Sequence, residues 1–387
     1  MPTTLGTKAG KWSGKVKARR HSSPRNQLGR PSSSVGAPKA AEQGGGASLG
    51  EAQVLETLQR AETSVERVKE QLENMERVDI MEAKKRTVRK VRKTAKVVAG
   101  ATLAVLMGFY FDVMPPAARY AVSLALAGVI ALRGYAKGSL SLSGSASALV
   151  VGFVTFSSWF TFGVVLMSFF FSSSFLTKLK QDEKEKVEKD FKKDGQRDWI
   201  QVLANGGVPT AIAFCYTAAV RHAAPQAFWV GAFLGYYSCC CGDTWSSEIG
   251  VLSPSDPILI TTLRRVRRGT NGGVSVWGLL ASVLGGAFIG LSFWIAAAMS
   301  PGLSASPASI WMCSLAGLFG SLVDSVLGAT LQFSGVEEGT MKVSNRPGKG
   351  IVRISGLHFL NNDAVNFVSA LVTALLCGIV FNKFSVV

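Results

Sequence analysis

Hydrophobic runs dominate the chain after about residue 94, whereas the residues before it are polar and densely charged. The runs lie at about 95–111, 117–133, 144–176, 202–220, 226–242, 273–298, 307–330 and 363–383. A helix needs about 20 apolar residues to cross a bilayer; several runs are shorter, and many contain the small residues Gly and Ser, which let helices approach closely. The pattern predicts an all-α fold, with a polytopic transmembrane helical bundle over residues 94–387.

The region before this bundle divides into two soluble segments. Residues 1–50 are rich in Ser, Gly, Pro, Lys and Arg, which predicts disorder. This start is also acid-poor, which is typical of an organellar transit peptide, although an ordinary cytosolic tail fits equally. Residues 51–93 carry apolar positions at alternating spacings of four and three, which predicts an amphipathic helix or short coiled coil. This seam would support either self-association through residues 54–75 or packing on the membrane domain. Its residues are Val54, Leu58, Ala61, Val65, Val68, Leu72 and Met75.

Charge predicts the topology of the bundle. A basic run over residues 84–96 precedes the first span and should stay inside by the positive-inside rule. With single crossings, the Lys-rich loop 178–197 would fall on the opposite face, against that rule. The run 144–176 is too long for one span and has a polar break at Ser157-Ser158-Trp159, which predicts two short or re-entrant helices. Loops 172–201, 243–272 and 331–362 then open toward the same compartment.

Composition agrees with a membrane protein. The net charge of +17 comes from Lys+Arg 42 against Asp+Glu 25, yet only 17% of residues are charged. Because the basic residues flank apolar runs, they indicate topology and no nucleic-acid partner. The six cysteines lie within or beside apolar runs without CxxC spacing, so a zinc site is unfavourable and small buried side chains are expected.

Acidic residues within or beside the apolar runs are candidate site residues. A carboxylate there is costly unless it is solvated, paired or bound to a cation. The string CGDTWSSEIG places Asp243 and Glu248 at the end of one run, and Asp324 lies inside another. A Mg²⁺ ion held by one or two carboxylates and substrate phosphates fits such residues. We therefore predict Asp243, Glu248 and Asp324 as metal ligands, with a structural polar contact as the alternative.

A cluster of arginines precedes a glycine-rich turn. Such a turn, leading into a helix, presents backbone N–H groups and the positive helix end to a phosphate, and arginines bind phosphate oxygens bidentately. The turn lacks the Lys-Ser/Thr ending of a Walker motif, and four arginines also serve as topology signals. The residues predicted to bind substrate or nucleotide phosphates here are Arg264, Arg265, Arg267, Arg268, Gly269, Thr270, Asn271, Gly272 and Gly273.

The last apolar run begins with the polar string NNDAVN. Asp363 and Asn366 lie one helical turn apart and are placed to share a ligand or cation. Asn and Asp are also ordinary N-caps, so one residue of this string is expected to cap the helix. We predict phosphate contacts for Asn361, Asn362 and Asn366, and a catalytic role for Asp363.

Two further polar strings fall on the same face. The first is Gly195-Gln196-Arg197-Asp198-Trp199, which leads into Gln201. The second, Asn205-Gly206-Gly207-Val208-Pro209-Thr210, is expected to break the start of a span.

These motifs together resemble the transmembrane protein 19 family over roughly residues 134–383. The strings are SSSFLTKLK, GQRDWIQVLANGGVPT, CGDTWSSEIG, ITTLRRVRRGTNGGVS, VDSVLGATLQ and NNDAVN. The same superfamily includes the plastid phytyl-phosphate kinase of tocopherol synthesis. The resemblance implies a membrane-embedded fold and marks Asp243, Ser246, Ser247, Glu248, Gly269, Thr270, Gly272, Asp324, Gly328, Asn361, Asn362, Asp363 and Asn366. The kinase branch typically has an acidic residue and an alanine where this chain has Asn271 and Gly273, so the resemblance does not transfer the substrate.

The residues and the resemblance favour a membrane-embedded phosphotransferase. Its substrate would be an isoprenoid alcohol or isoprenyl monophosphate from the lipid bilayer, and its cofactors Mg²⁺ and CTP or ATP. Asp243, Asp324 and Asp363 would be catalytic, because phosphoryl transfer requires positioning and charge neutralisation. The alternatives are a non-catalytic transporter or lipid-phosphate-binding protein, and a scaffold acting through its N-terminal helix. The N-terminus favours a plastid envelope or thylakoid membrane, whereas the family resemblance also allows the endoplasmic reticulum.

Overall fold

The chain forms two units, Met1–Thr87 and Val88–Val387. The computed structural model describes scattered residues between 56 and 82, and then residues 110–187, 189, 195–222, 226–300 and 305–384. The predicted disordered segment 1–50 and the basic run before the first span lie outside the described residues. So does the predicted span 95–111, apart from its last two residues.

In the first unit the described residues are helical, including all of residues 62–75. Val65, Val68, Leu72 and Met75 of the predicted seam are each more than half exposed. The other three seam residues lie outside the described part. An exposed apolar stripe of this kind is compatible with a helical partner, and self-association stays a prediction.

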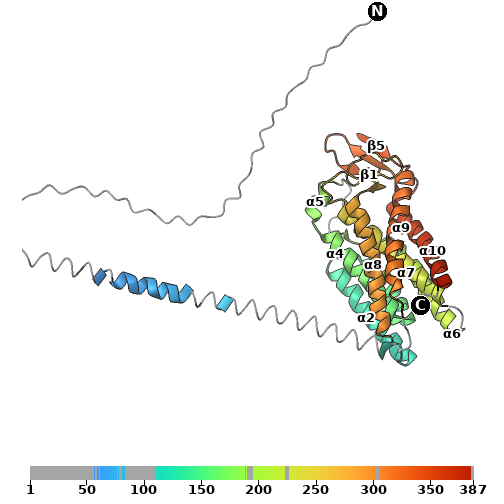
Figure 1. Cartoon of the computed structure of the whole chain (residues 1–387), viewed down its shortest axis with the longest axis horizontal. Helices are drawn as coiled ribbons and strands as arrows, with labels where there is room; N and C mark the ends of the chain where they lie inside the picture. Colours follow the sequence, from blue (N-terminus) through green and yellow to red (C-terminus); the bar gives the residue numbers. More distant parts are fainter. Residues whose placement is uncertain are drawn as a thin grey trace, which may run out of the picture. The chain divides into compact units, whose positions relative to one another are not determined.

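In the second unit, long helices form a bundle (Figure 1). Among the described residues, six helices are long and apolar enough to cross a membrane, and α3 is a shorter apolar helix of 17 residues. The predicted polytopic helical bundle is confirmed. The helices are α2 (Pro116–Ala136), α3 (Leu142–Ser158), α4 (Phe160–Lys178), α5 (Gln181–Glu185), α6 (Trp199–Arg221), α7 (Ala227–Gly250), α8 (Val276–Ala298), α9 (Ala308–Leu331) and α10 (Asn362–Phe384), of which α2, α4, α6, α8, α9 and α10 meet the membrane-spanning criteria.

Helix α7 is the central element of the bundle. It packs against α4, α6, α8, α9 and α10, and every residue from Val230 to Gly242 is buried. A Cβ atom at Gly242 would lie 2.7 Å from the carbonyl oxygen of Gly317 on α9, so the close approach of these helices requires glycine. This agrees with the expectation that small residues allow a compact membrane bundle. The three consecutive cysteines from Cys239 to Cys241 are buried and free, as small apolar side chains.

The run 144–176 forms two helices, as its length and polar break predict. Helix α3 ends at Ser158 and α4 begins at Phe160, with Trp159 in an extended conformation between them. The expected break at Pro209 is wrong, because α6 is continuous from Trp199 to Arg221. Membrane helices tolerate an internal proline where neighbouring groups satisfy the freed backbone, although the carbonyl of Asn205 loses its helical N–H donor.

Short strands occupy one end of the bundle, near α5 (Figure 1). β1 (Ile258–Leu259) pairs antiparallel with β2 (Gly273–Val274). A second sheet has the order β4-β3-β5 and consists of β3 (Ser334–Glu337), β4 (Val343–Ser344) and β5 (Ile351–Ser355), all antiparallel. Lys189 connects the segment after α5 to this sheet, since its Nζ forms an ion pair of 2.6 Å with Glu337.

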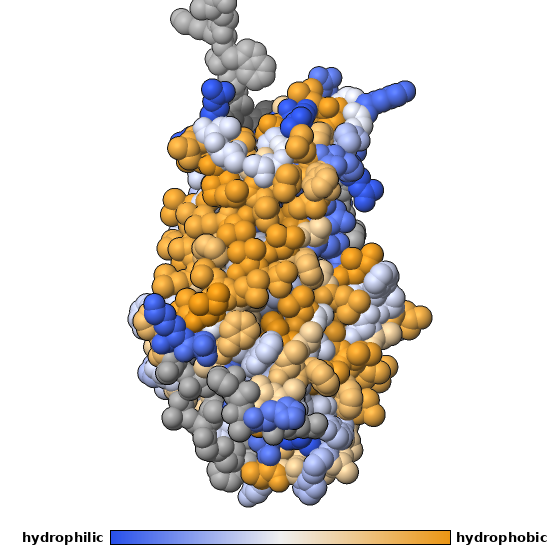
Figure 2. Space-filling view, turned by 90° about the vertical axis from the view of Figure 1, so that its right-hand side faces the viewer, coloured by the Kyte–Doolittle hydropathy of each residue, from blue (hydrophilic) through white to orange (hydrophobic). Residues whose placement is uncertain are grey.

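The outer surface of the helices is apolar. Figure 2 shows apolar side chains across the middle of the visible face and hydrophilic side chains toward its ends. Leu132, Phe214 and Trp311 are 70%, 68% and 75% exposed. Large apolar side chains so exposed over several helices fit contact with lipid rather than water.

Candidate functional site

A polar cavity lies where the loops at the strand-bearing end of the bundle meet. It encloses about 1910 Å³ that protein atoms do not fill, including the part open to the surroundings. Apart from Phe169, its lining comes from segments 177–205, 243–278 and 324–366, so the three polar regions that the charge pattern assigned to one compartment line one cavity. The predicted site residues that line it are Asp243, Glu248, Arg268, Gly269, Thr270, Asn271, Gly272, Gly273, Asp324, Asn362, Asp363 and Asn366.

Two carboxylates from neighbouring helices lie in this cavity. Asp243 is inside α7, which continues two turns beyond it, and Asp324 is inside α9. Ser321 Oγ donates a hydrogen bond of 3.3 Å to Asp243 Oδ1, and Ser369 Oγ donates one of 3.1 Å to Asp324 Oδ2. With its amide nitrogen turned toward Asp324, Asn366 adds a hydrogen bond of 3.0 Å to the same oxygen.

No cationic side chain neutralises this pair within the described part of the chain, because neither carboxylate forms a salt bridge there. The charge of Asp324 acts directly on Asp243, so the two repel each other when both are ionised. Each is partly exposed to the cavity. Two such carboxylates in a membrane domain are strongly stabilised by a bound cation.

Glu248, the third predicted metal ligand, has a partner in the protein. Lys184 of α5 donates to its carboxylate, and this lysine is almost fully buried. Lys184 Nζ also donates to the carbonyl oxygens of Leu176, at 2.7 Å, and Thr177, at 3.3 Å, which are at the C-terminal end of α4. Lys184 therefore attaches α5 and Glu248 to the end of α4.

The glycine loop, residues 269–273, packs against α9. Gly269 and Gly272 have φ angles of 84° and 76°, and a Cβ atom at Gly272 would lie 2.5 Å from the carbonyl oxygen of Ser325. The backbone N–H groups of Gly269 and Gly272 have no acceptor within the described residues, and the buried Thr270 hydroxyl likewise has none. These unpartnered donors in the cavity lining suit a phosphate.

Asn271 holds this loop to the second sheet. Its backbone N–H donates to Ser334 Oγ at 2.9 Å, and its Nδ2 donates to the carbonyl of Phe333 at 3.0 Å. The loop does not lead directly into a helix, since β2 intervenes and Ser275 caps α8. The phosphate-binding role predicted for the loop therefore depends on its own N–H groups rather than on a helix terminus.

The four arginines before the loop differ in whether they line the cavity. Arg268 lines the cavity, and its Nε lies 3.8 Å from Asp256 Oδ1. Arg264, Arg265 and Arg267 are exposed and do not line it. Their segment folds back on β1, since Leu259 N–H donates to the carbonyl of Arg264. Phosphate binding by these three arginines stays a prediction without support from their positions.

The residues of the polar string at the start of α10 also have different positions. Asn361 Oδ1 accepts a hydrogen bond of 2.9 Å from the N–H of Ala364, so this residue caps the helix. Asn362, Asp363 and Asn366 line the cavity. The expectation that one residue of this string caps the helix is confirmed, and Asn361 is outside the cavity lining.

Arg197 and Lys184 also line the cavity, although neither was predicted as a site residue; Arg197 belongs to the polar string 195–199 that was expected on this face. Arg197 Nη1 donates to Ser174 Oγ at 2.7 Å, and the guanidinium lies 5.6 Å from the centre of the Phe170 ring. Burial lowers the pKa of the Arg197 guanidinium, and the charge of Glu248 acts in the opposite direction. Lys184 was one of seven lysines in loop 178–197, and nothing in their spacing distinguished it.

Protein side chains supply only part of a metal shell here. Within the described residues there is no group of three or more His, Cys, Asp or Glu side chains that could hold a metal ion. Asp243 and Asp324 offer two carboxylates to a cation, whereas Glu248 is paired with Lys184. This set fits Mg²⁺, which commonly keeps water ligands and takes others from substrate phosphates.

Residues 124–374, more than half of the chain, match the family described as Integral membrane protein DUF92. The chain belongs to this family. The DUF92 match includes every residue that lines the polar cavity, and the superfamily predicted from the motifs is confirmed. The protein is an integral membrane protein.

Two relatives of this DUF92 protein are from Arabidopsis thaliana. Protein PGR is 40% identical over 68% of this chain and 96% of its own length. Protein VTE6, chloroplastic, is 29% identical over 59% of this chain and 62% of its own length. An uncharacterised membrane protein of Methanocaldococcus jannaschii is 28% identical over 70% of this chain and 98% of its own length. No solved structure matches the chain.

Proposed function

We propose that this protein is a membrane phosphotransferase that transfers the terminal phosphoryl group of CTP or ATP to an isoprenyl monophosphate or isoprenoid alcohol. The observation that carries the proposal is the pair Asp243 and Asp324, which share one cavity with the glycine loop. Phosphoryl transfer is catalysed mainly by positioning and charge neutralisation, and these residues suit both tasks. The motif resemblance to the superfamily of phytyl-phosphate kinase, together with the similarity to VTE6, supports the same assignment.

Each part of the cavity has a role in this reaction. The N–H groups of the glycine loop and the guanidinium of Arg268 would hold the nucleotide phosphates. Asp243 and Asp324 would bind Mg²⁺, which would neutralise charge on the transferred phosphoryl group. Asn362 and Asn366 would orient phosphate oxygens through their amide groups.

The reaction forms one bond and breaks one. An oxygen of the acceptor bonds to the terminal phosphorus of the nucleotide, while the bond from that phosphorus to the bridging oxygen breaks. The nucleoside diphosphate leaves with that oxygen, and a lipid diphosphate results when the acceptor is a monophosphate. A monophosphate acceptor already carries a nucleophilic oxygen, whereas an alcohol must lose a proton, for which Asp363 is the proposed acceptor.

The proposed location is a plastid membrane. The N-terminal composition resembles a transit peptide, and the printed name of one relative, VTE6, is chloroplastic. An endoplasmic reticulum location is the alternative, and imaging of the full chain fused to a C-terminal fluorescent protein would distinguish the two.

The activity is tested with the full-length protein purified in detergent. Incubation with Mg²⁺, phytyl or farnesyl monophosphate, and CTP or ATP should give the lipid diphosphate. Asp243→Asn should abolish turnover, because the near-isosteric amide removes one negative charge from the carboxylate pair. Asp182→Asn, an exposed change on α5, is the matched control and should retain turnover.

Full turnover by a folded Asp243→Asn variant would contradict the assigned role. The decisive negative result is that folded wild-type protein phosphorylates neither the isoprenyl monophosphates nor phytol with either nucleotide. The non-catalytic carrier would then replace the kinase as the proposed function. That alternative predicts nucleotide-independent movement of a labelled isoprenyl phosphate into vesicles that contain the protein.

A further inference from the structure

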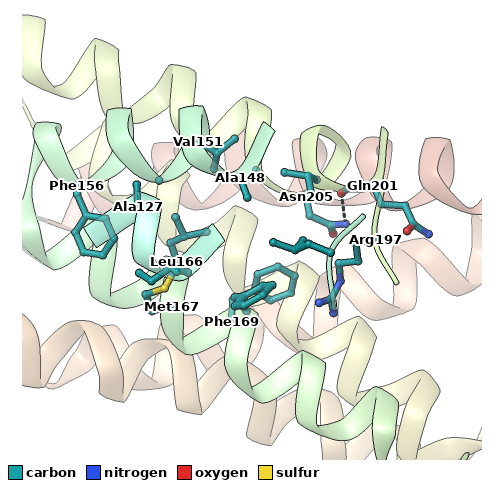
Figure 3. A pocket seen from close by; sticks show the side chains of 16 residues that line it. Ala127, Ala148, Val151, Phe156, Leu166, Met167, Phe169, Arg197, Gln201 and Asn205 are labelled. Atoms are coloured by element: carbon teal, nitrogen blue, oxygen red, sulfur yellow. Dashed lines mark hydrogen bonds between the residues drawn. The ribbon is translucent and has the colours of Figure 1, made fainter. Parts of the chain in front are cut away.

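An apolar groove runs between four helices of the bundle. Its lining comes from α2, α3, α4 and α6 and includes Ala127, Ala148, Val151, Phe156 and Leu166. Figure 3 shows Phe156, Ala127, Leu166 and Met167 around one part of it and Arg197, Gln201 and Asn205 at the other end. The groove encloses about 610 Å³ that protein atoms do not fill, including the part open to the surroundings.

This groove adjoins the polar cavity. Phe169, Arg197, Gln201 and Asn205 line both spaces. Two adjoining spaces of this kind, one apolar and one polar, suit a molecule with an apolar tail and a charged head. Apart from these shared polar residues, the groove lining consists of apolar side chains and glycines, so the tail itself would meet no hydrogen-bonding side chain.

Arg197 is placed at the junction of the two spaces with its charge incompletely matched. Within the described residues its one side-chain hydrogen bond goes to Ser174, and it forms no salt bridge. Its position is fixed through the backbone, because its N–H donates to the carbonyl of Ser139 at 3.1 Å and its carbonyl accepts from Ser141 at 2.9 Å. A half-buried, preorganised guanidinium with unused N–H groups is suited to a phosphate.

We propose that this groove binds the hydrocarbon chain of an isoprenyl monophosphate, with the phosphate at Arg197. The inference rests on the proposed function and adds the site and orientation of the acceptor. A phosphate attached directly to one chain fits an arginine that lines both the groove and the cavity. In this orientation the phosphate faces the space that also contains Asp243, Asp324 and the glycine loop, as transfer from a nucleotide requires.

A single hydrocarbon chain fits better than a two-chain phospholipid. Small residues on three helices, Ala127, Ala148 and Gly206, form part of the lining and leave a narrow passage between the helices. A Cβ atom at Gly206 would lie 2.9 Å from Val151 Cγ1, so α3 and α6 approach closely there. A glycerophospholipid would have to place a second chain and a glycerol unit between its phosphate and this passage.

Binding measured without nucleotide tests the groove directly. The full-length protein in detergent is titrated with radiolabelled phytyl monophosphate and with isopentenyl monophosphate, which has one isoprene unit. Phytyl monophosphate should bind at least about tenfold more tightly, because burial of each further methylene is favourable. Ala148→Trp, which fills the groove, should remove this advantage and leave the affinity for isopentenyl monophosphate unchanged. Ala146→Trp, at an exposed position on the same helix, should bind like wild type.

Arg197 is tested by the preference for phosphate over alcohol. Wild type should prefer phytyl monophosphate to phytol by at least about tenfold, as expected for a charge-assisted contact. Arg197→Gln should bind both alike, and Arg197→Lys should recover part of the preference. An unchanged preference in folded Arg197→Gln would overturn the placement of the phosphate.

Photocrosslinking of wild-type protein keeps the test independent of these variants. Phytyl monophosphate with a diazirine on its tail should label peptides from α2, α3, α4 and α6. Labelling confined to α8 and α9, or equal affinity for the long and short chains, would overturn the proposal. If the groove bound the lipid but the protein showed no kinase activity, this inference would stand and the proposed function would be refuted. If the protein showed kinase activity but the label attached outside the groove, the proposed function would stand and this inference would be refuted.

Discussion

Gly272 lies at the point where the glycine loop contacts α9, and its substitution tests how firmly that loop is held. Alanine at a φ of 76° is strained, which costs about 1–2 kcal/mol. Its Cβ atom would also lie 2.5 Å from the carbonyl oxygen of Ser325 and 2.7 Å from the backbone nitrogen of Ala329. Such overpacking against backbone adds about 1–3 kcal/mol. Gly272→Ala should therefore destabilise the protein by about 2–5 kcal/mol.

Gly350→Ala provides the matched control. Gly350 has a similar φ of 71°, and nothing lies within 4 Å of a Cβ atom placed there. This variant carries the conformational cost without the contact, and should lose only about 1–2 kcal/mol. The difference between the two variants isolates the packing of the loop on α9, which we expect to be about 1–3 kcal/mol.

Unfolding in one detergent by a chemical denaturant, followed by intrinsic fluorescence, gives this comparison. Thermal midpoints recorded at one heating rate rank the variants if unfolding is irreversible. Gly272→Ala should also bind CTP or ATP more weakly, whereas Gly350→Ala should bind as wild type does. Equal stability of the two variants would refute the argument, because it would show that the loop moves away from α9 at no cost.

Three further predictions concern other parts of the site. Lys184→Met should destabilise the protein by about 3 kcal/mol or more, because Glu248 keeps an unpaired charge and the α4 carbonyls lose a donor. Adding Glu248→Gln should restore part of the lost stability, as measured by chemical unfolding. Asn361→Ala should cost about 1 kcal/mol through the lost cap, whereas Asn361→Ser should retain both stability and turnover. Lost turnover in a stable Asn361→Ser protein would instead indicate a direct phosphate contact. Chelation of Mg²⁺ should stop diphosphate formation, and Asp324→Asn should raise the Mg²⁺ concentration needed for half-maximal turnover; an unchanged Mg²⁺ dependence would argue against a carboxylate ligand there.

The bundle and the common direction of its loops were predictable because long-range order in a membrane protein follows from two simple constraints. Apolar length identifies the spans, and the position of basic residues orients them. Together they required the run 144–176 to form two helices, and the chain turns at Trp159 as expected. The same reasoning placed Asp243 at one polar face, and the cavity there also contains Asp324, which was predicted only to lie inside an apolar run.

Other features of the site depend on contacts that no local pattern encodes. Arg268 lines the cavity while Arg265 does not, because Arg265 pairs with Ile258 of β1. The burial of Lys184 depends on the end of α4 and on Glu248, which lies 64 residues later in the chain. The apolar groove is assembled from faces of four helices, and the apolar sequence of each helix alone does not indicate that a groove lies between them. The strands of the second sheet have only two to five residues, too few for a clear alternation.

The central position of α7 has a consequence for biogenesis. Although it has 24 residues and is surrounded by five helices, α7 is not among the described helices apolar enough to be recognised as a span by themselves. Tyrosine, serine and Asp243 reduce its partitioning into lipid, so we expect it to be retained in the membrane only together with its neighbours. A glycosylation-site reporter should then show poor insertion of residues 227–250 alone and efficient insertion of residues 227–298. The helix that carries a key acidic residue of the site would thus depend on α8 to enter the bilayer at all.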